Sequence, residues 1–291
     1  MSLHAPLHAG PEPTEPLRPD DPIVYAVLDD LRHTLRMGWV DASIRSLSPY
    51  PMFLSAAWAA TRPNVTKSFS LGAERLRVAS LRAIRGLIAA DLDGREQDPV
   101  PEEDERLRRT AQAIHCASPR VFLVIQAWAI LARRQRLPGT GSEEPPARRG
   151  VPVWQEGVVT GPRSVSSEAE ALLDDATVAL RVALAPPALQ AAAVWPYVLE
   201  RAWRDLHRIA SRPGWAAATM ELRRLTSEVL RSLPHPMTLQ WDVLARRGLT
   251  EDRRRALADH LSALAASMPA FLLSASYLAD WLDAADAPPD W

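Results

Sequence analysis

The sequence predicts an all-α protein. Residues 23–35, 70–87 and 166–182 place apolar side chains three or four positions apart, with arginines and acids between them, which is the period of an amphipathic helix. The alternation of apolar and polar residues that marks strands is nearly absent. Proline and glycine fall between the apolar segments, where helices are expected to end.

The expected helix ends follow one another along the chain. Breaking residues occur, in order, at Pro49 and Pro51, Pro63, 98–101, 138–141, 213–214 and 234–236. Near the C-terminus, Thr250 precedes Glu251, Asp252 and an amphipathic run over 253–264. A threonine at that place caps free backbone N–H groups, and the acids favour the positive end of the helix dipole. We therefore expect a helix to start there.

Composition excludes several classes of function. The 291 residues are 47% hydrophobic and 24% charged, which suits a soluble globular protein with a substantial core. The net charge is -1 and there is no basic run, so a general nucleic-acid binder is not expected. The most apolar run, 121–132, is shorter than the ~20 residues that span a membrane. We expect a cytoplasmic protein with neither nucleic acid nor membrane as a partner.

Common catalytic and metal-binding signatures are absent from the sequence. Cys116 is the only cysteine, which excludes an internal disulfide and a thiolate zinc site, and the apolar run after it predicts a buried thiol. The seven histidines do not pair at metal-ligand spacing outside the N-terminal tail. No GxSxG, P-loop, GxGxxG, HExxH or CxxC motif occurs. We predict no cofactor and no metal.

Two stretches of the chain resemble each other at a constant offset of 145 residues (174 − 29 = 145). The first carries Leu28-Asp29-Asp30, Leu35-Arg36, Pro51, Leu54 and Ala57-Trp58, and the second carries Leu173-Asp174-Asp175, Leu180-Arg181, Pro196, Leu199 and Ala202-Trp203. A gapless match that includes proline and tryptophan exceeds what shared helical composition produces. We interpret the chain as a tandem duplication, in which two helical-bundle repeats form a pseudo-dimer about a pseudo-twofold axis. Trp58 and Trp203 each follow a helix-starting proline by seven residues, and we expect both to be buried anchors.

This interpretation divides the chain into four parts. Residues 1–21 are rich in Pro, Asp, Glu and His and are predicted to form a disordered tail. The first helical repeat covers 22–135 and the second covers 166–291. Between them, 136–165 collects Pro, Gly, Ser and opposing charges, which is typical of a linker that partly packs on the surface.

The paired acids Asp29-Asp30 and Asp174-Asp175 suggest catalysis at first sight. Adjacent positions on a helix point about 100° apart, so the two carboxylates of a pair do not converge on one atom. We predict that they are solvated or that one of each pair is the partner of a neighbouring arginine.

Several motifs, in order and in both halves, resemble one enzyme family. They are VLDDLR at 27–32, TLR at 34–36, YPMFL at 50–54, AW at 57–58 and RP at 62–63, then WPYVLERAW at 195–203, LPHP at 233–236, Leu244, GL at 248–249 and MPAFLL at 268–273. Over 22–135 and 166–285 the chain is similar to the group I 2-haloacid dehalogenases (the halocarboxylic acid dehydrogenase family).

The resemblance implies an all-α pseudo-dimer with its active site in the groove between the repeats. It also implies a hydrolytic reaction without a cofactor. In this reaction an aspartate activates a water that attacks the halogen-bearing carbon of a short 2-haloacid. An asparagine holds the water, and halide leaves without a covalent ester intermediate. A carboxylate in an apolar groove is a stronger base, because burial disfavours its charged form.

The chain departs from this pattern at the residues that carry the chemistry. Ala188 stands where the resemblance places the aspartate, and Ala202 lies where the asparagine is expected. Residues 166–291 contain no asparagine, so that absence does not depend on the alignment. Ser118 stands before Pro119, where the family favours an asparagine. The sequence therefore predicts that the expected catalytic pair is missing.

Other residues of the implied substrate-binding groove are present. Trp39 matches a pocket-lining aromatic residue, and Ser43 corresponds to Ala188 under the repeat (188 − 43 = 145). Asp41 is the one ionisable group near that rim, where it serves either as a substitute base or as the cap of the next helix. Tyr277 and Trp128 either reach the groove or pack in the core.

Three functions remain open at this point. The first is a hydrolytic 2-haloacid dehalogenase, and the second is a catalytically impaired relative that binds a small carboxylate or apolar molecule in the groove. The third is a helical interaction module without a ligand. The expected partner for the first two is a short 2-substituted carboxylic acid. A buried carboxylate in a dry groove favours the first, a groove without an ionisable group the second, and a groove filled by side chains the third.

Overall fold

The computed structural model of the chain describes residues 21–90, 105–148, 150 and 165–282. Within these residues the secondary structure is helical, apart from one isolated bridge between Leu137 and Met237. The all-α prediction is confirmed. The expected tail at 1–21 lies outside the described residues except for its last residue, and so does most of 149–164 in the expected linker.

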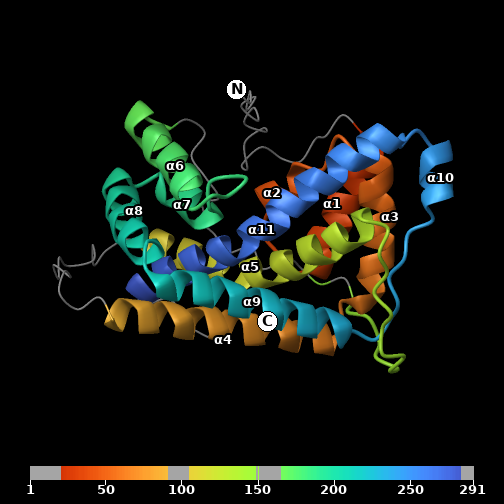
Figure 1. Cartoon of the computed structure of the whole chain (residues 1–291), viewed down its shortest axis with the longest axis horizontal. Helices are drawn as coiled ribbons and strands as arrows, with labels where there is room; N and C mark the ends of the chain where they lie inside the picture. Colours follow the sequence, from red (N-terminus) through yellow and green to blue (C-terminus); the bar gives the residue numbers. More distant parts are fainter. Residues whose placement is uncertain (1–20, 91–104, 149, 151–164, 283–291) are drawn as a thin grey trace.

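Two pairs of long helices form the body of the molecule (Figure 1). Helices α5 (Glu105–Ala132) and α11 (Glu251–Trp281) pack together through its centre. Helices α4 (Lys67–Ala89) and α9 (Pro213–Arg231) run side by side along one face. Each pair joins one helix from the first half of the sequence to one from the second half.

Shorter helices cover the two ends of this body (Figure 1). At one end lie α1 (Pro22–Thr34), α2 (Ala42–Arg45), α3 (Pro51–Thr61), the 3₁₀ turn η1 (Arg62–Asn64) and α10 (Trp241–Arg246). At the other end lie α6 (Ser167–Ala179), α7 (Pro187–Ala192) and α8 (Pro196–Ala210). Apart from α10, the two ends of the molecule are therefore built from different halves of the sequence.

The central pair forms the core of the protein. Both α5 and α11 contain a proline near the middle, Pro119 and Pro269, and nearly every side chain after it is buried. By length and composition, both helices are apolar enough to cross a membrane, yet 83% of the most apolar window of each is buried inside the protein. Cys116 lies in this core, as expected, and burial raises the pKa of its thiol.

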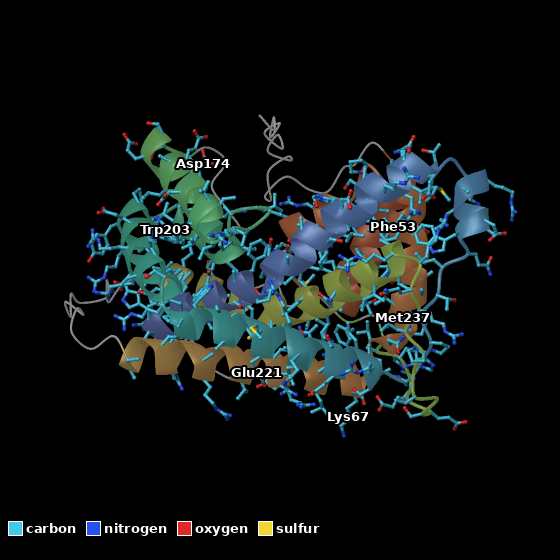
Figure 2. All side chains as sticks on the ribbon, in the orientation of Figure 1. Phe53, Lys67, Asp174, Trp203, Glu221 and Met237 are labelled. Carbon is cyan, nitrogen blue, oxygen red and sulfur yellow. The ribbon has the colours of Figure 1, made fainter. Side chains whose placement is uncertain are left out.

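The two predicted tryptophan anchors are buried and bonded in the same way. Trp58 and Trp203 are each 4% exposed. The indole of Trp58 donates to Asp30 at 2.8 Å, and the indole of Trp203 donates to Asp175 at 2.8 Å. Arg62 also donates to Asp30, at 2.7 Å. The prediction that one acid of the first pair is an arginine's partner is confirmed. Asp174 is exposed on α6 (Figure 2).

Helix boundaries in the two halves keep the offset of 145 residues. Helices α1 and α6 start at 22 and 167, α2 and α7 at 42 and 187, and α3 and α8 at 51 and 196. The turn after the first helix of each set uses a left-handed residue, Arg36 (φ 54) and Arg181 (φ 53). The repeat therefore keeps the starts of the helices, while α1 and α6 are also equal in length, at 13 residues each.

The two ends are not equally well packed. Leu28, Leu35 and Met37 are at most 2% exposed in the first half. Their counterparts at the same offset, Leu173, Leu180 and Val182, are half-buried. The α6–α8 end therefore has a looser apolar interior than the α1–α3 end.

Hydrogen bonds join segments from the two halves. The side-chain amide of Asn64 donates to the backbone carbonyl of His235 at 2.9 Å and accepts the backbone N–H of His235 at 2.8 Å. In the expected linker, Thr140 bonds to Leu233 and Ala147 bonds to Val65. Its described part therefore packs on both halves, as the sequence suggested, while the domain boundaries stay a prediction.

Glycine is required where α4 crosses α9. A Cβ added at Gly72 would lie 2.3 Å from a methyl group of Val229, whereas one added at Gly86, on the same helix, meets nothing within 4 Å. We expect Gly72→Ala to lower the free energy of unfolding by about 1–3 kcal/mol through overpacking. The matched change Gly86→Ala raises it by about 0.5–1 kcal/mol, because alanine favours the helix.

Urea unfolding of the two variants and the wild type measures this difference. Equal effects of the two substitutions would contradict close contact between α4 and α9 at Gly72.

Candidate functional site

The sequence-predicted site residues lie on helices that meet at the central pair. Helix α7, which carries Ala188, contacts α5, α8 and α11, and α2, which carries Ser43, contacts α5. Ser43, Ala188 and Ala202 are all buried, with at most 1% of their area exposed. Their helices come together around α5 and α11, as the resemblance implies, and the roles of these residues in binding stay a prediction.

Asp41 caps a helix. Its carboxylate accepts the backbone N–H of Ser43 at 2.8 Å at the start of α2. It is 7% exposed, and burial raises its pKa, while hydrogen bonds from Ser43 and the charge of Arg45 act in the opposite direction. Capping was one of the two roles predicted for Asp41. A raised pKa is also a property of a general base, so the structure leaves that second role open to test.

Two of the remaining candidates are hydrogen-bonded inside the protein, and the third packs at its edge. Ser118 donates to the carbonyl of Ile114 at 2.7 Å, one turn back on α5. Trp128 is fully buried and donates to Thr61 at 3.0 Å, so it packs in the core. Trp39 is half-buried and packs against the core before α2. Of these three, Trp39 alone has more than a small fraction of its surface exposed.

A buried polar cluster that the sequence analysis missed surrounds Asp205. Tyr277 donates its hydroxyl to Asp205 at 2.7 Å, and Arg201 and Arg208 pair with the same carboxylate at 3.4 and 3.2 Å. Tyr277, predicted to bind substrate, thus joins α11 to α8 through this carboxylate. The signal was available in the sequence, because Arg201, Asp205 and Arg208 are spaced to meet on one face of a helix.

The buried acids of the described residues are Asp41 and Asp205. One caps a helix, and the other accepts from two guanidinium groups and a phenol. Within the described ranges, no three His, Cys, Asp or Glu side chains gather as metal ligands would.

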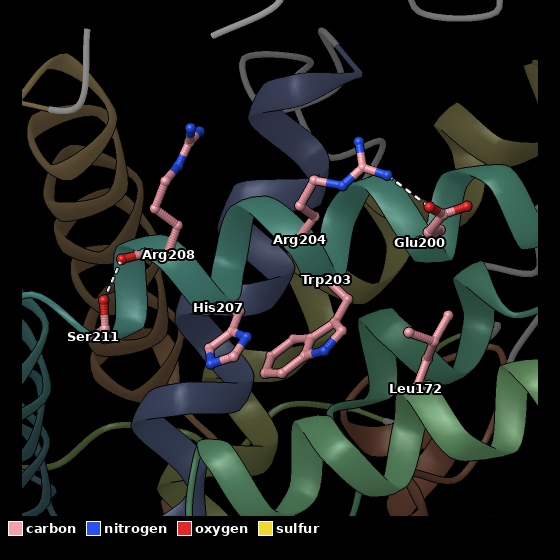
Figure 3. Close-up of a pocket in the computed structure, with 7 residues that line it drawn as sticks. All are labelled: Leu172, Glu200, Trp203, Arg204, His207, Arg208 and Ser211. Atoms are coloured by element: carbon pink, nitrogen blue, oxygen red, sulfur yellow. Dashed lines mark hydrogen bonds and ion pairs between the residues drawn. The ribbon is translucent and has the colours of Figure 1, made fainter. Parts of the chain in front are cut away.

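A hollow of about 440 Å³ lies along the outer face of α8 (Figure 3). Its lining consists of Leu172 from α6 and six residues from α8 and its end, namely Glu200, Trp203, Arg204, His207, Arg208 and Ser211. It shares no residue with the candidates taken from the sequence. Of the residues that line this surface, only Trp203 was predicted from the sequence to be buried, and none was predicted to bind a ligand.

Comparison with known proteins supports the resemblance found in the sequence. The chain is 26% identical over 244 residues to a configuration-inverting 2-haloacid dehalogenase from Pseudomonas sp. (strain 113), which covers 77% of this chain and 76% of that protein. No protein-family model matches the chain.

Solved structures share the fold. A D-2-haloacid dehalogenase mutant in complex with D-2-CPA superposes with a TM-score of 0.78 and 18% identity, over 94% of this chain and 98% of that one. A D-2-haloacid dehalogenase with L-LA gives a TM-score of 0.77 and 17% identity, over 90% and 93%. These structures extend the likeness to nearly the whole chain.

The cap and the charge of Asp41 can be separated by substitution. Asp41→Ala removes the cap and lowers the free energy of unfolding by about 0.5–2 kcal/mol. Asn caps equally well, so Asp41→Asn keeps the cap and removes the buried charge. Because the folded-state pKa is raised above 3.8, the native state holds its proton more tightly. The wild type therefore loses stability relative to Asp41→Asn as pH rises from about 4 through the raised pKa.

Urea unfolding of both variants between pH 4 and neutrality measures this pH dependence. A larger loss at pH 7 in Asp41→Asn than in Asp41→Ala would show that the charge, and not the cap, stabilises the protein.

Proposed function

Because the chain is a distant homologue of the configuration-inverting 2-haloacid dehalogenases, we propose that it binds a small 2-substituted carboxylate between its halves with little or no hydrolytic turnover. The observation that carries this proposal is the state of the two buried acids. Asp41 and Asp205 both hold other groups of the protein, and alanine stands at the positions expected for the aspartate and the asparagine.

The loss of turnover follows from the chemistry of the attacking water. Direct displacement of halide needs a group that accepts the proton of this water, and loss of a positioned general base lowers a rate by ~10²–10⁴-fold. Loss of the asparagine removes orientation of the same water, so the two losses do not simply add. A residual rate is expected from any environment that still holds a water near the substrate.

Small side chains favour retention of the binding function. Ser43, Ala188 and Ala202 are small and buried, and their helices meet at α5 and α11. Solved homologues hold D-2-CPA and L-LA, small 2-substituted carboxylates, in the same fold. A ligand of that class is the natural occupant of an interior lined by small side chains. The proposed substrate-binding residues are therefore Trp39, Ser43, Ser118, Ala188 and Ala202, with Tyr277 positioned through Asp205.

We also infer that the chain arose by tandem duplication and forms a pseudo-dimer of two helical repeats. The equal helix starts, the left-handed Arg36 and Arg181, and the matching indole–carboxylate bonds support it. A crystal structure that superposes 22–135 on 166–285 with Trp58 on Trp203 and Pro51 on Pro196 is the expected result. Non-equivalent positions of the two tryptophans would contradict the inference.

A second candidate function is an active hydrolase that uses Asp41 as its base. The observation in its favour is the burial of Asp41, which raises its pKa and so makes it a better proton acceptor. Its N-cap bond to the backbone N–H of Ser43 is made by one carboxylate oxygen, Oδ1. The same experiment separates the two functions.

The test is halide release from both enantiomers of 2-chloropropionate by the purified protein, with binding measured in parallel by calorimetry. We expect binding with turnover near the background rate, and a detectable gain in Ala188→Asp. The isosteric control Ala188→Asn adds a side chain of the same size without a basic group, so it should bind without gaining turnover.

Three results would contradict the proposal. Robust turnover that disappears in Asp41→Asn, with stability retained, would establish Asp41 as the base. Turnover that survives that substitution would place the base elsewhere. If neither enantiomer binds, a small 2-substituted carboxylate is not the ligand of this protein.

A further inference from the structure

Two helices on different sides of the protein carry outward-facing stripes of residues that complement each other. We propose that α6 of one copy of the chain packs antiparallel on α4 of a second copy. Figure 1 places α6 above the central pair and α4 below it, so the two helices of one chain do not meet. The inference is independent of the proposed function, because neither stripe contains a residue of the interior site.

The α4 stripe lies on the side of that helix that faces away from the protein. Its residues, spaced four, three and four positions apart, are Leu71, Arg75, Val78 and Arg82. This spacing keeps them on one face of the helix. All four are exposed, Leu71 by 55% and Val78 by 40%. Among the described residues, neither arginine of the stripe has an ion-pair partner.

The α6 stripe has the same spacing and the opposite charge. Its residues are Ser167, Ala171, Asp174 and Val178, and all of them are exposed, Val178 by 75%. They lie on the side of α6 opposite its buried alanines, Ala169 and Ala176. Figure 2 shows Asp174 on the outer side of the protein, and within the described part of the chain it has no ion-pair partner.

An antiparallel alignment brings like with like and charge with countercharge. The facing pairs are then Leu71 with Val178, Arg75 with Asp174, Val78 with Ala171, and Arg82 with Ser167, which is followed by Glu168. A spacing of four, three and four is that of the seam between two helices of a coiled coil. The contact would remove apolar side chains from water and would pair an arginine with a carboxylate.

The charges of the two whole helices also favour this contact. Helix α4 carries five bases (Lys67, Arg75, Arg77, Arg82, Arg85) and one acid (Glu74), so its net charge is 5 − 1 = +4. Helix α6 carries four acids (Glu168, Glu170, Asp174, Asp175) and no base. Complementary charge of this kind steers two surfaces together and selects between partners.

The same charges disfavour contact between identical stripes. Two α4 stripes would gather the arginines of both copies, and two α6 stripes would gather their acids. The contact is therefore between unlike surfaces, which joins copies into a ring or an open chain. One short helix on one stripe covers less than the ~1,200 Å² of a stable interface, so we expect weak association that depends on concentration.

Sedimentation velocity of the full chain tests this association. Between about 5 and about 500 µM protein at about 0.05 M salt, the mean mass should rise with concentration. At about 1 M salt, where surface charges are screened, the protein should remain monomeric over the same range.

Charge reversals test the register of the two helices. Asp174→Arg and Arg75→Asp should each weaken self-association by about tenfold, because like charges then face each other. Both positions are exposed, so the fold should persist, which circular dichroism checks. Both changes in one chain keep the net charge and should restore association. An equimolar mixture of the two single variants should associate as well, since every contact between unlike variants pairs opposite charges.

The matched control is Asp252→Arg. Asp252 is 95% exposed on α11, outside both stripes, and this substitution alters the net charge by as much as Asp174→Arg does. It should leave self-association unchanged.

The proposal would be overturned by a protein that stays monomeric at every concentration in low salt. Association that high salt leaves intact, or that Asp174→Arg and Asp252→Arg weaken equally, would do the same. Failure of the double variant to regain association would show that Arg75 and Asp174 do not face each other.

Discussion

The contact between α5 and α11 determines the rest of the structure. Each helix comes from a different half of the chain, each has a proline near its middle, and nearly all the side chains that follow are buried against the partner. Apolar surface of this extent has to be removed from water, and a single half cannot cover its own central helix. The antiparallel pair α4 and α9 shows the same dependence of one half on the other, because Gly72 and Gly214 let each helix approach a branched side chain of the other, Val229 and Leu87.

Much of this architecture was predictable from spacing in the sequence. The offset between the Leu-Asp-Asp, Pro and Trp motifs predicts where the helices start, and they start there. The burial of Trp58 and Trp203 followed from the same pattern. The different packing of the two ends was harder to predict, because Leu28 and Leu173 open the same Leu-Asp-Asp motif and yet differ in burial. Such coverage is set by tertiary contacts and not by local residues.

The candidate site was predicted in part, for a related reason. Alignment and repeat offset indicated which helices meet, and α2, α7 and α8 each contact at least one of the two central helices, α5 and α11. The bonding of individual side chains was harder to foresee. Tyr277 bonds to Asp205, and the spacing of Asp205 with its partners Arg201 and Arg208 is typical of an exposed ion pair on a helix. Asp205 is instead buried, and a buried carboxylate has to be fully paired. Among the described residues, the two buried carboxylates thus bond to other groups of the protein.

We propose that the fold holds a small 2-substituted carboxylate without the base that would hydrolyse it. A crystal structure of the protein with D-2-chloropropionate tests this proposal. We expect an intact ligand beside Ala188 and Ala202, with no carboxylate oxygen within about 2.6–3.2 Å of a water that faces the halogen-bearing carbon. Lactate in place of the ligand, or a water held there by Asp41, would contradict it.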